Sequence, residues 1–284
     1  MIYKRPGVHA GIKGLIRLAG ELRARRFDAA ILLQNAIEAA ILTFMAGIPV
    51  RAGYDSDARG WLLTHAVHRT RAVRKVHQIN YYRAMLCALG CEPAEMGMLL
   101  RPGKDDHELA ERLMKNFGLE KDRMLVGIAP GAAYGPAKQW LPDRFAAVAD
   151  RLSSESDARI LLFGSAGDCD SIQDVQRFSS FPLVDLSGKT SLREAIILIS
   201  SCGLFISNDS GLMHVAGALG VPTVAIFGST NPVTTSPYGE KTILVKGRAD
   251  CSPCLKKVCP TDFRCMKSIS VDDVYNAAKT LIKS

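Results

Sequence analysis

From residue 124 onward, short apolar runs alternate with amphipathic segments of helical period. The runs are rich in Val, Ile, Leu and Phe, and the helical segments span 10–13 residues. Apolar strands joined by helices of this length are typical of a parallel sheet with helices on both faces. We therefore predict an α/β fold with a doubly wound parallel sheet. The predicted strands are 124–130, 159–164, 182–188, 204–209, 222–228 and 242–247, and the predicted helices are 142–154, 168–178, 191–202, 211–220 and 271–283.

The first 100 residues show a less regular version of the same pattern. The predicted helices are 10–26, 36–47 and 77–90, and the predicted extended pieces are 28–33, 49–54 and 62–67. The stretch 101–106 reads as a passage into a further helix at 107–118. Since 284 residues suffice for two lobes of ordinary size, we predict one lobe over residues 1–100 and another over 101–284.

Composition excludes several classes of protein. Hydrophobic residues make up 48% of the chain and charged residues 23%, which are values of a folded globular protein. No apolar run reaches the roughly 20 residues that span a bilayer. The start, MIYKRPGVHAGIKG, lacks the apolar stretch of a signal peptide. We therefore expect a cytoplasmic protein whose cysteines are reduced.

The net charge of +8 is concentrated in the first lobe. Residues 1–100 contain 14 Lys and Arg against 7 Asp and Glu. The densest basic runs, 23–26 and 69–75, allow two interpretations. They are either contacts for phosphates or anionic lipid head groups, or an ordinary solvated surface.

The stretch 208-NDSG-211 stands between a predicted strand and a predicted helix. In a doubly wound sheet, ligands bind outside the carboxyl ends of the strands. The free N–H groups of a first helical turn and the helix dipole favour an anion such as a pyrophosphate. The plainer alternative is that Asp209 only caps the helix. His214 lies about one turn further, where it is either a satisfied interior histidine or a ligand contact.

Two more loops leave the carboxyl ends of predicted strands. The loop 228–239 contains Gly, Ser, Thr, Asn and Pro, and its hydroxyl groups can donate to phosphate. The loop 130–140 contains two glycines and Lys138, but it lacks the spacing of a nucleotide-hydrolysing P-loop. Each loop alone is a weak signal. Together, the three loops favour one anion-binding crevice.

The segments PGAAYGPAKQW, FGSAGD and SNDSGLMHVAGALGVPTVAIFGSTNP make the sequence recognisable. The chain resembles the bacterial ADP-heptose:lipopolysaccharide heptosyltransferases over nearly its whole length. The resemblance implies a two-lobe glycosyltransferase of the B type with Rossmann-like sheets, whose carboxyl-terminal lobe binds the nucleotide sugar. It also implies donor-binding roles for Lys138 at the diphosphate or the phosphate nearest the sugar, and for Thr230 beside the nucleotide and Asp168 at the ribose. Those implied at the diphosphate and heptose are Asp209, Ser210, Gly211 and His214.

The chemistry implied by the resemblance is the transfer of heptose from ADP-L-glycero-D-manno-heptose to a heptose of the lipopolysaccharide inner core, with inversion. Lys138 would stabilise the departing ADP, and no cofactor would be needed for catalysis. The acceptor-side lobe would be the amino-terminal one. We expect a monomer, peripheral to the inner membrane, that binds no nucleic acid. The alternatives are a related transferase with another nucleotide sugar and a form that only binds the donor.

The resemblance also predicts an acidic base in a Gly-Asp loop after the first strand of the amino-terminal lobe. The chain begins at what resembles the third strand-helix region of that lobe, so about 60 residues, two units of roughly 30 each, are expected to be missing. Asp28, Asp55 and Asp57 do not replace the base convincingly. On this interpretation the chain binds the donor but transfers poorly.

The segment 251-CSPCLKKVCPTDFRC-265 contains Cys251, Cys254, Cys259 and Cys265 with the spacing C-x2-C-x4-C-x5-C. Four thiols in so short a segment fit a structural zinc or iron–sulfur site. A reduced cysteine-rich loop, or a disulfide, explains the same residues. A catalytic metal is not expected, because four cysteines would saturate the ion.

Overall fold

The computed structural model describes residues 7–92, 99–103, 106–119 and 123–283. The chain divides into two compact units, Met1–Glu95 and Met96–Ser284. Lys104 and Asp105 of the predicted passage, like Met1, lie outside the described residues. No helix within the described ranges is both long and apolar enough to cross a bilayer.

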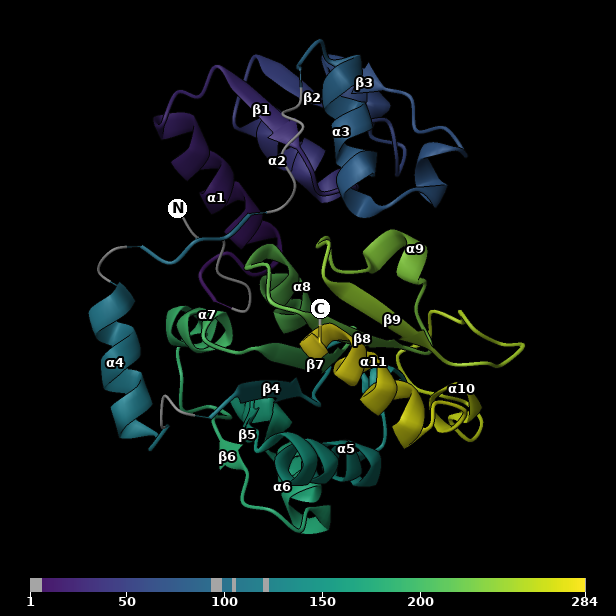
Figure 1. Cartoon of the computed structure of the whole chain (residues 1–284). Coiled ribbons are helices and arrows are strands. Elements are labelled where there is room, and N and C mark those ends of the chain that lie inside the picture. Colours follow the sequence, from purple (N-terminus) through teal and green to yellow (C-terminus); the bar gives the residue numbers. More distant parts are fainter. Residues whose placement is uncertain (1–6, 93–98, 104–105, 120–122, 284) are drawn as a thin grey trace. The chain divides into compact units, whose positions relative to one another are not determined.

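The first unit holds a parallel three-stranded sheet of order β1-β2-β3 within its described residues (Figure 1). In this sheet Ala29 pairs with Val50, and Ala52 with His65. The strands are β1 (Ala29–Leu32), β2 (Val50–Tyr54) and β3 (His65–Val67), and the α-helices are α1 (Gly11–Ala24), α2 (Ile37–Met45) and α3 (Gln78–Ala88). Each matches a predicted element. The helix predicted to end at Gly47 ends at Met45, and Gly47 follows its C-cap with a φ of +71°, which glycine tolerates best.

Two small apolar clusters hold the first unit together. One surrounds Leu32, Leu62 and Leu63, and the other surrounds Tyr54 and Met85. Neither cluster is large, so polar contacts supplement them. For example, the buried Arg59 side chain donates to the Tyr54 carbonyl at the end of β2 and to two carbonyl oxygens of the loop after β1.

The second unit is a parallel six-stranded sheet of order β6-β5-β4-β7-β8-β9 within its described residues. The strands are β4 (Leu125–Ala129), β5 (Arg159–Leu162), β6 (Val184–Asp185), β7 (Leu204–Asn208), β8 (Thr223–Phe227) and β9 (Thr242–Lys246). The chain runs outward from β4 to β6 and then returns to the other side of β4. The strand order therefore reverses between β4 and β7, where ligands of doubly wound sheets bind.

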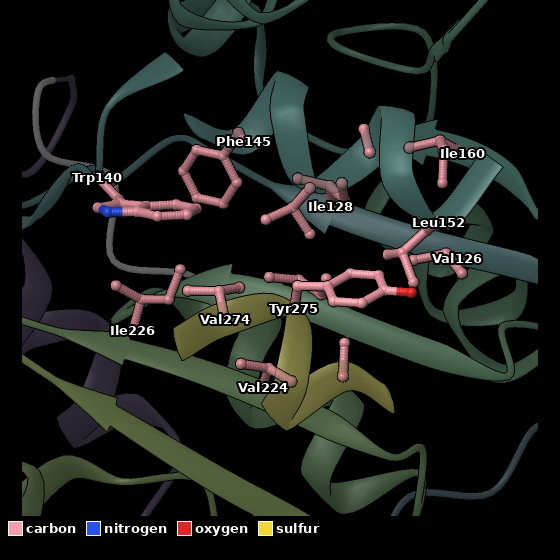
Figure 2. Close-up of a cluster of buried hydrophobic side chains, with 14 of the residues drawn as sticks. Val126, Ile128, Trp140, Phe145, Leu152, Ile160, Val224, Ile226, Val274 and Tyr275 are labelled. Carbon is pink, nitrogen blue, oxygen red and sulfur yellow. The ribbon is translucent and has the colours of Figure 1, made fainter. Parts of the chain in front are cut away.

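Helices cover both faces of this sheet, as the sequence predicted (Figure 1). Alternate strand residues point to opposite faces: Val126 belongs to one buried cluster and Leu125 to the other. The first cluster packs against α5 (Pro142–Ser156), α6 (Cys169–Phe178) and α11 (Val271–Lys283), and the second against α4 (Asp106–Asn116), α7 (Leu192–Ser200) and α8 (Gly211–Ala218). Figure 2 shows the first cluster, with Val274 and Tyr275 beside the strand residues.

Trp140 anchors the amino-terminal end of α5 in the first cluster. It is 2% exposed, and its ring meets the Phe145 ring edge-on with 5.0 Å between centroids (Figure 2). The indole N–H donates to the Ile269 carbonyl at 3.2 Å. A buried Trp needs such a partner for its one donor. Trp140 therefore fixes the end of the 130–140 loop, which contains Lys138.

Two short α-helices among the described residues were not predicted from the sequence. They are α9 (Pro232–Thr235) inside the 228–239 loop and α10 (Arg264–Lys267) at the end of the cysteine-rich segment. Asn231 caps α9 by accepting from the Val233 N–H at 3.1 Å, and Pro232 occupies its first turn. A single turn is too short to show helical periodicity, so only the Asn-Pro pair signalled α9.

Candidate nucleotide-sugar site

A pocket of about 500 Å³ lies at the carboxyl ends of the central strands of the second unit. Its walls come from the loop after β4, the loop after β5, the residues before α7, and the beginning of α8. Predicted site residues Asp168, Ser210 and Gly211 line it. The pocket therefore lies at the reversal of strand order, and at the carboxyl ends of the strands, where the sequence predicted the crevice.

The amino-terminal end of α8 is open toward this pocket. Ser210 is the N-cap residue, but its side chain makes no capping hydrogen bond. Its hydroxyl instead lies 3.0 Å from the Ser207 hydroxyl. At Gly211 an added Cβ would meet no atom within 4 Å, so the approach to the backbone is clear. The first-turn N–H groups of α8 thus lack a side-chain cap and favour an anion.

Asp209 is the centre of a polar cluster rather than a helix cap. Its Oδ2 atom accepts from Lys138 Nζ at 2.7 Å and from the Thr230 hydroxyl at 2.6 Å. Lys138 lies on the loop after β4, and Thr230 on the loop after β8. The three predicted loops therefore meet at one carboxylate. The alternative in which Asp209 only caps α8 is wrong, because its carboxylate turns toward the neighbouring loops.

Asn208, the residue before Asp209, binds the loop after β4. Its side chain accepts from the Trp140 backbone N–H at 3.0 Å and donates to the Pro130 carbonyl at 2.6 Å. Both ends of the 130–140 loop are thus fastened to β7. Because Asn208 is fully buried, these two bonds also satisfy its amide. Asn208 consequently helps to position the loop that contains Lys138.

Asp168 lines the pocket within a capping box. Its Oδ2 accepts from the Ser165 N–H at 2.8 Å and from the Ser165 hydroxyl at 2.6 Å. Gly131 lies directly opposite, and a Cβ at that position would overlap the Asp168 carboxylate. Glycine at 131 therefore allows the loop after β4 to approach Asp168 closely.

His214 is half-buried on α8 and is not without an interaction partner. In the described part of the chain it is not among the residues that line the pocket. Its predicted contact with heptose stays a prediction.

Sequence reasoning missed the apolar wall of the pocket and the segment before α7. Phe163, Leu192 and Val215 supply apolar surface, and Thr190 and Ser191 supply hydroxyl groups nearby. The available signal was the capping box Ser-x-x-Glu, which marks the beginning of α7 and hence one more carboxyl-end loop.

The four cysteines of the 251–265 segment line one small pocket of about 120 Å³. The four cysteines, close together in the sequence, therefore also lie around one pocket in the structure. In the fully described 251–265 segment, however, no three of them are placed to hold a metal ion. Cys265 is buried, which raises the pKa of its thiol, and the neighbouring thiols raise it further.

Asp55 and Asp57 of the first unit each accept a hydrogen bond from a backbone N–H group and so stabilise the local fold. Asp55 accepts from the Arg69 backbone N–H at 2.8 Å, which lowers the pKa of its carboxyl. Asp57 accepts from the Ile37 N–H at 2.8 Å and so caps the amino-terminal end of α2.

Solved structures with the same fold define the class. The match to the E. coli ADP-heptose lipopolysaccharide heptosyltransferase II has a TM-score of 0.78 at 27% identity and covers 95% of this chain and 80% of that one. The match to a glycosyl transferase family 9 protein from Veillonella parvula has a TM-score of 0.86 at 26% identity, over 100% and 82%. Fold and pocket together identify a glycosyltransferase of the B type.

Sequence comparison gives the family. The model of glycosyltransferase family 9 (heptosyltransferase) matches residues 15–263, and the chain belongs to this family. Lipopolysaccharide heptosyltransferase 2 of Salmonella typhimurium is 34% identical over 238 residues, which cover 81% of this chain and 68% of the relative. Its counterpart in E. coli K12 is 32% identical over the same shares.

Proposed function

We propose that this heptosyltransferase transfers heptose from ADP-L-glycero-D-manno-heptose to a heptose of the lipopolysaccharide inner core. The observation that carries the proposal is the meeting of Lys138, Thr230 and Asp209 beside a pocket at the uncapped end of α8. Such a site offers a cation, a hydroxyl and backbone N–H groups to a diphosphate. The pocket next to it has the size and apolar wall that a nucleoside requires.

The donor occupies this site in a defined order. The adenosine lies in the 500 Å³ pocket, with its ribose at Asp168. The diphosphate lies at the beginning of α8, in contact with Ser210 and Gly211. Lys138 shares its positive charge between Asp209 and the diphosphate. It thereby stabilises the negative charge that develops on ADP when the bond to the heptose breaks. His214 and Asp209 face the heptose.

The acceptor side belongs to the first unit. Its 14 Lys and Arg against 7 Asp and Glu, counted over residues 1–100, favour an anionic partner, such as a phosphate group or an anionic lipid head group. The same charge supports peripheral attachment to the cytoplasmic face of the inner membrane. The monomeric state stays a prediction. Names of the relatives, which include lipopolysaccharide and lipooligosaccharide heptosyltransferases 2, support this acceptor.

The decisive assay offers the enzyme two donors and one acceptor. Purified protein is incubated with a heptosylated inner-core acceptor and either ADP-heptose or an ADP-hexose that lacks the extra carbon. Any transfer, which the missing base is expected to make slow, should give a product one heptose heavier, with the anomeric configuration inverted, from ADP-heptose alone. Equal transfer from the hexose donor favours the alternative of another nucleotide sugar. ADP binding without transfer favours a donor-binding form.

Transfer requires no metal cofactor on this proposal, because Lys138 and the end of α8 supply the positive charge that a metal would otherwise provide. Activity that survives exhaustive treatment with a chelator is the expected result. A structural zinc on the four cysteines stays a prediction of its own. The test measures the metal content of protein purified without chelator, for the wild type and for Cys254→Ser. Near one equivalent of zinc that is lost in the variant is the expected result.

A further inference from the structure

The cysteine segment, residues 251–265, lies against both loops whose side chains meet at Asp209. Between Asp250 and Phe263 it contains no helix or strand, and this stretch is fully described. Its position therefore depends on the contacts it makes with the rest of the second unit.

Toward the loop after β4, the cysteine segment makes two hydrogen bonds and one close packing contact. The Tyr134 hydroxyl donates to the Leu255 carbonyl at 2.9 Å, and the Ala137 N–H donates to the Lys257 carbonyl at 3.0 Å. A Cβ on Gly135 would overlap that same Lys257 carbonyl. The loop and the segment thus touch over the residues that immediately precede Lys138.

Toward the loop after β8, the cysteine segment makes two further bonds. The Leu255 N–H donates to the Ser229 carbonyl at 2.8 Å, and the Ser252 hydroxyl donates to the Gly228 carbonyl at 2.6 Å. Ser229 directly precedes Thr230, the other residue that binds Asp209. Both loops are therefore held one to four residues from their site residues.

Leu255 joins these two sets of contacts through its own peptide groups. Its carbonyl accepts from Tyr134 and its N–H donates to Ser229. Leu255 also has a φ of +57°, a left-handed conformation that is costly for a residue with a side chain and persists only when surrounding contacts hold it. Since 59% of its side chain is exposed, these backbone bonds rather than apolar packing hold it.

The contacts close a ring of interactions around the site. It runs from Leu255 through Tyr134 to Lys138, then through Asp209 to Thr230, and back through Ser229 to Leu255. Tyr134 contributes twice, because Lys138 Nζ also lies 4.8 Å from the centroid of its ring. That distance is within the range of a cation–π interaction.

We propose that the cysteine segment is a clamp that holds the two donor loops in register, and that Tyr134 is a positioning residue for Lys138. The inference rests on the proposed donor site, since its functional readout is donor binding. Loosening the clamp lets Lys138 and Thr230 drift from the diphosphate, so donor affinity falls while acceptor affinity does not change.

The test compares two substitutions at Tyr134 with a matched control. Tyr134→Phe removes the bond to Leu255 and keeps the ring, and Tyr134→Leu removes both. We expect ADP affinity, measured by calorimetry, to fall about fivefold in the first, as for one neutral hydrogen bond, and further in the second. The control is Tyr275→Phe, because Tyr275 also donates a hydrogen bond, to Glu155 at 2.6 Å, and lies under a cation, with Arg151 3.7 Å from its ring centroid. This control should leave ADP affinity unchanged.

A double-mutant cycle distinguishes positioning from a general loss of stability. If Tyr134 acts through Lys138, Tyr134→Phe should have no further effect on ADP affinity in a Lys138→Ala background. An undiminished effect in that background overturns the positioning role, as does unchanged affinity in Tyr134→Leu.

Hydrogen exchange tests the clamp without any donor. Tyr134→Leu should speed exchange in peptides covering residues 251–258 and 228–231, with peptides of β5 unaffected. Failure of wild-type protein to bind ADP would contradict the proposed function. The hydrogen-exchange result would still test the clamp, because it requires no donor. Unchanged exchange in both peptides overturns the clamp itself.

Discussion

Lys138 Nζ lies 2.7 Å from Asp209 Oδ2, with only 14% of the lysine side chain and 6% of the aspartate side chain exposed. The two residues come from different loops and are joined only by the fold. Because both are largely removed from water, each is the main partner of the other's charge. A donor diphosphate that enters the site meets a lysine already ordered in place, which lowers the entropic cost of binding.

Removing the lysine should weaken binding of ADP. Lys138→Ala deletes a charged contact and also leaves Asp209 as an uncompensated negative charge near the diphosphate. We expect a loss of about 1.5–3 kcal/mol in the free energy of ADP binding, measured by calorimetry. Lys279→Ala serves as the control, because Lys279 is half-exposed beside Glu155. Equal affinities in the wild type and Lys138→Ala would remove Lys138 from the donor site.

The ion pair should also be visible in the stability of the protein. Asp209→Asn keeps an acceptor for Thr230 but leaves Lys138 without its counter-charge. Breaking a buried pair on one side costs about 3–5 kcal/mol. Adding Lys138→Met to Asp209→Asn should restore part of that loss, because no unpaired charge then remains. Denaturant unfolding of the two single variants and the double variant measures this. Additive losses would show that the two side chains do not interact in solution.

A methyl group at residue 131 should disturb the nucleoside pocket. In Gly131→Ala the new Cβ overlaps the Asp168 carboxylate, which must move away from the Ser165 cap. Overpacking of this kind typically costs about 1–3 kcal/mol, and we expect ADP affinity to fall at least severalfold. Gly167→Ala is a matched control in the same region, since the nearest atom would be 3.6 Å away. Indistinguishable ADP affinities in the two variants would count against Asp168 as a ribose contact.

Thiol alkylation should distinguish Cys259 from Cys202. The Thr261 hydroxyl and the backbone N–H groups of Thr261 and Phe263 lower the pKa of the Cys259 thiol, whereas burial raises the pKa of Cys202 to about 12. A lowered pKa increases the reactive thiolate fraction at any pH below the normal thiol value, and a raised pKa decreases it. Iodoacetamide at neutral pH should therefore label Cys259 first and Cys202 only after unfolding. Peptide mass spectrometry measures both rates, and early labelling of Cys202 in folded protein would contradict the expectation.

The sequence predicted the fold well where the pattern is repetitive. The apolar runs at 124–130, 204–209 and 222–228 all form buried parallel strands. A short run of consecutive apolar residues is buried on both sides in such a sheet, which removes its apolar surface from water. It also predicted that the loops carrying Lys138 and Thr230 converge with Asp209, since the carboxyl ends of parallel strands share one edge.

The partners of individual side chains were harder to predict. Asn208 and Asp209 both have the composition of helix caps, and only the pairing of β7 beside β4 and β8 shows that they bind across loops instead. The contact between Tyr134 and Leu255 spans 121 residues of sequence and leaves no local pattern. The spacing of the four cysteines suggested that their thiols converge. Their exact arrangement depends on backbone turns that the sequence does not specify.

The adjacency of β4 and β7 has a consequence for the order of folding. Val126 pairs with Leu204, so this contact closes a long stretch of chain that includes β5 and β6. Contacts between residues so distant in sequence form late, because their loop-closure entropy is offset only once intervening structure exists. The pocket, whose walls come from both sides of that closure, is then assembled only once β7 has paired with β4. ADP binding during refolding would accordingly report this late closure, and a bound donor would stabilise molecules in which it has formed over partly folded ones.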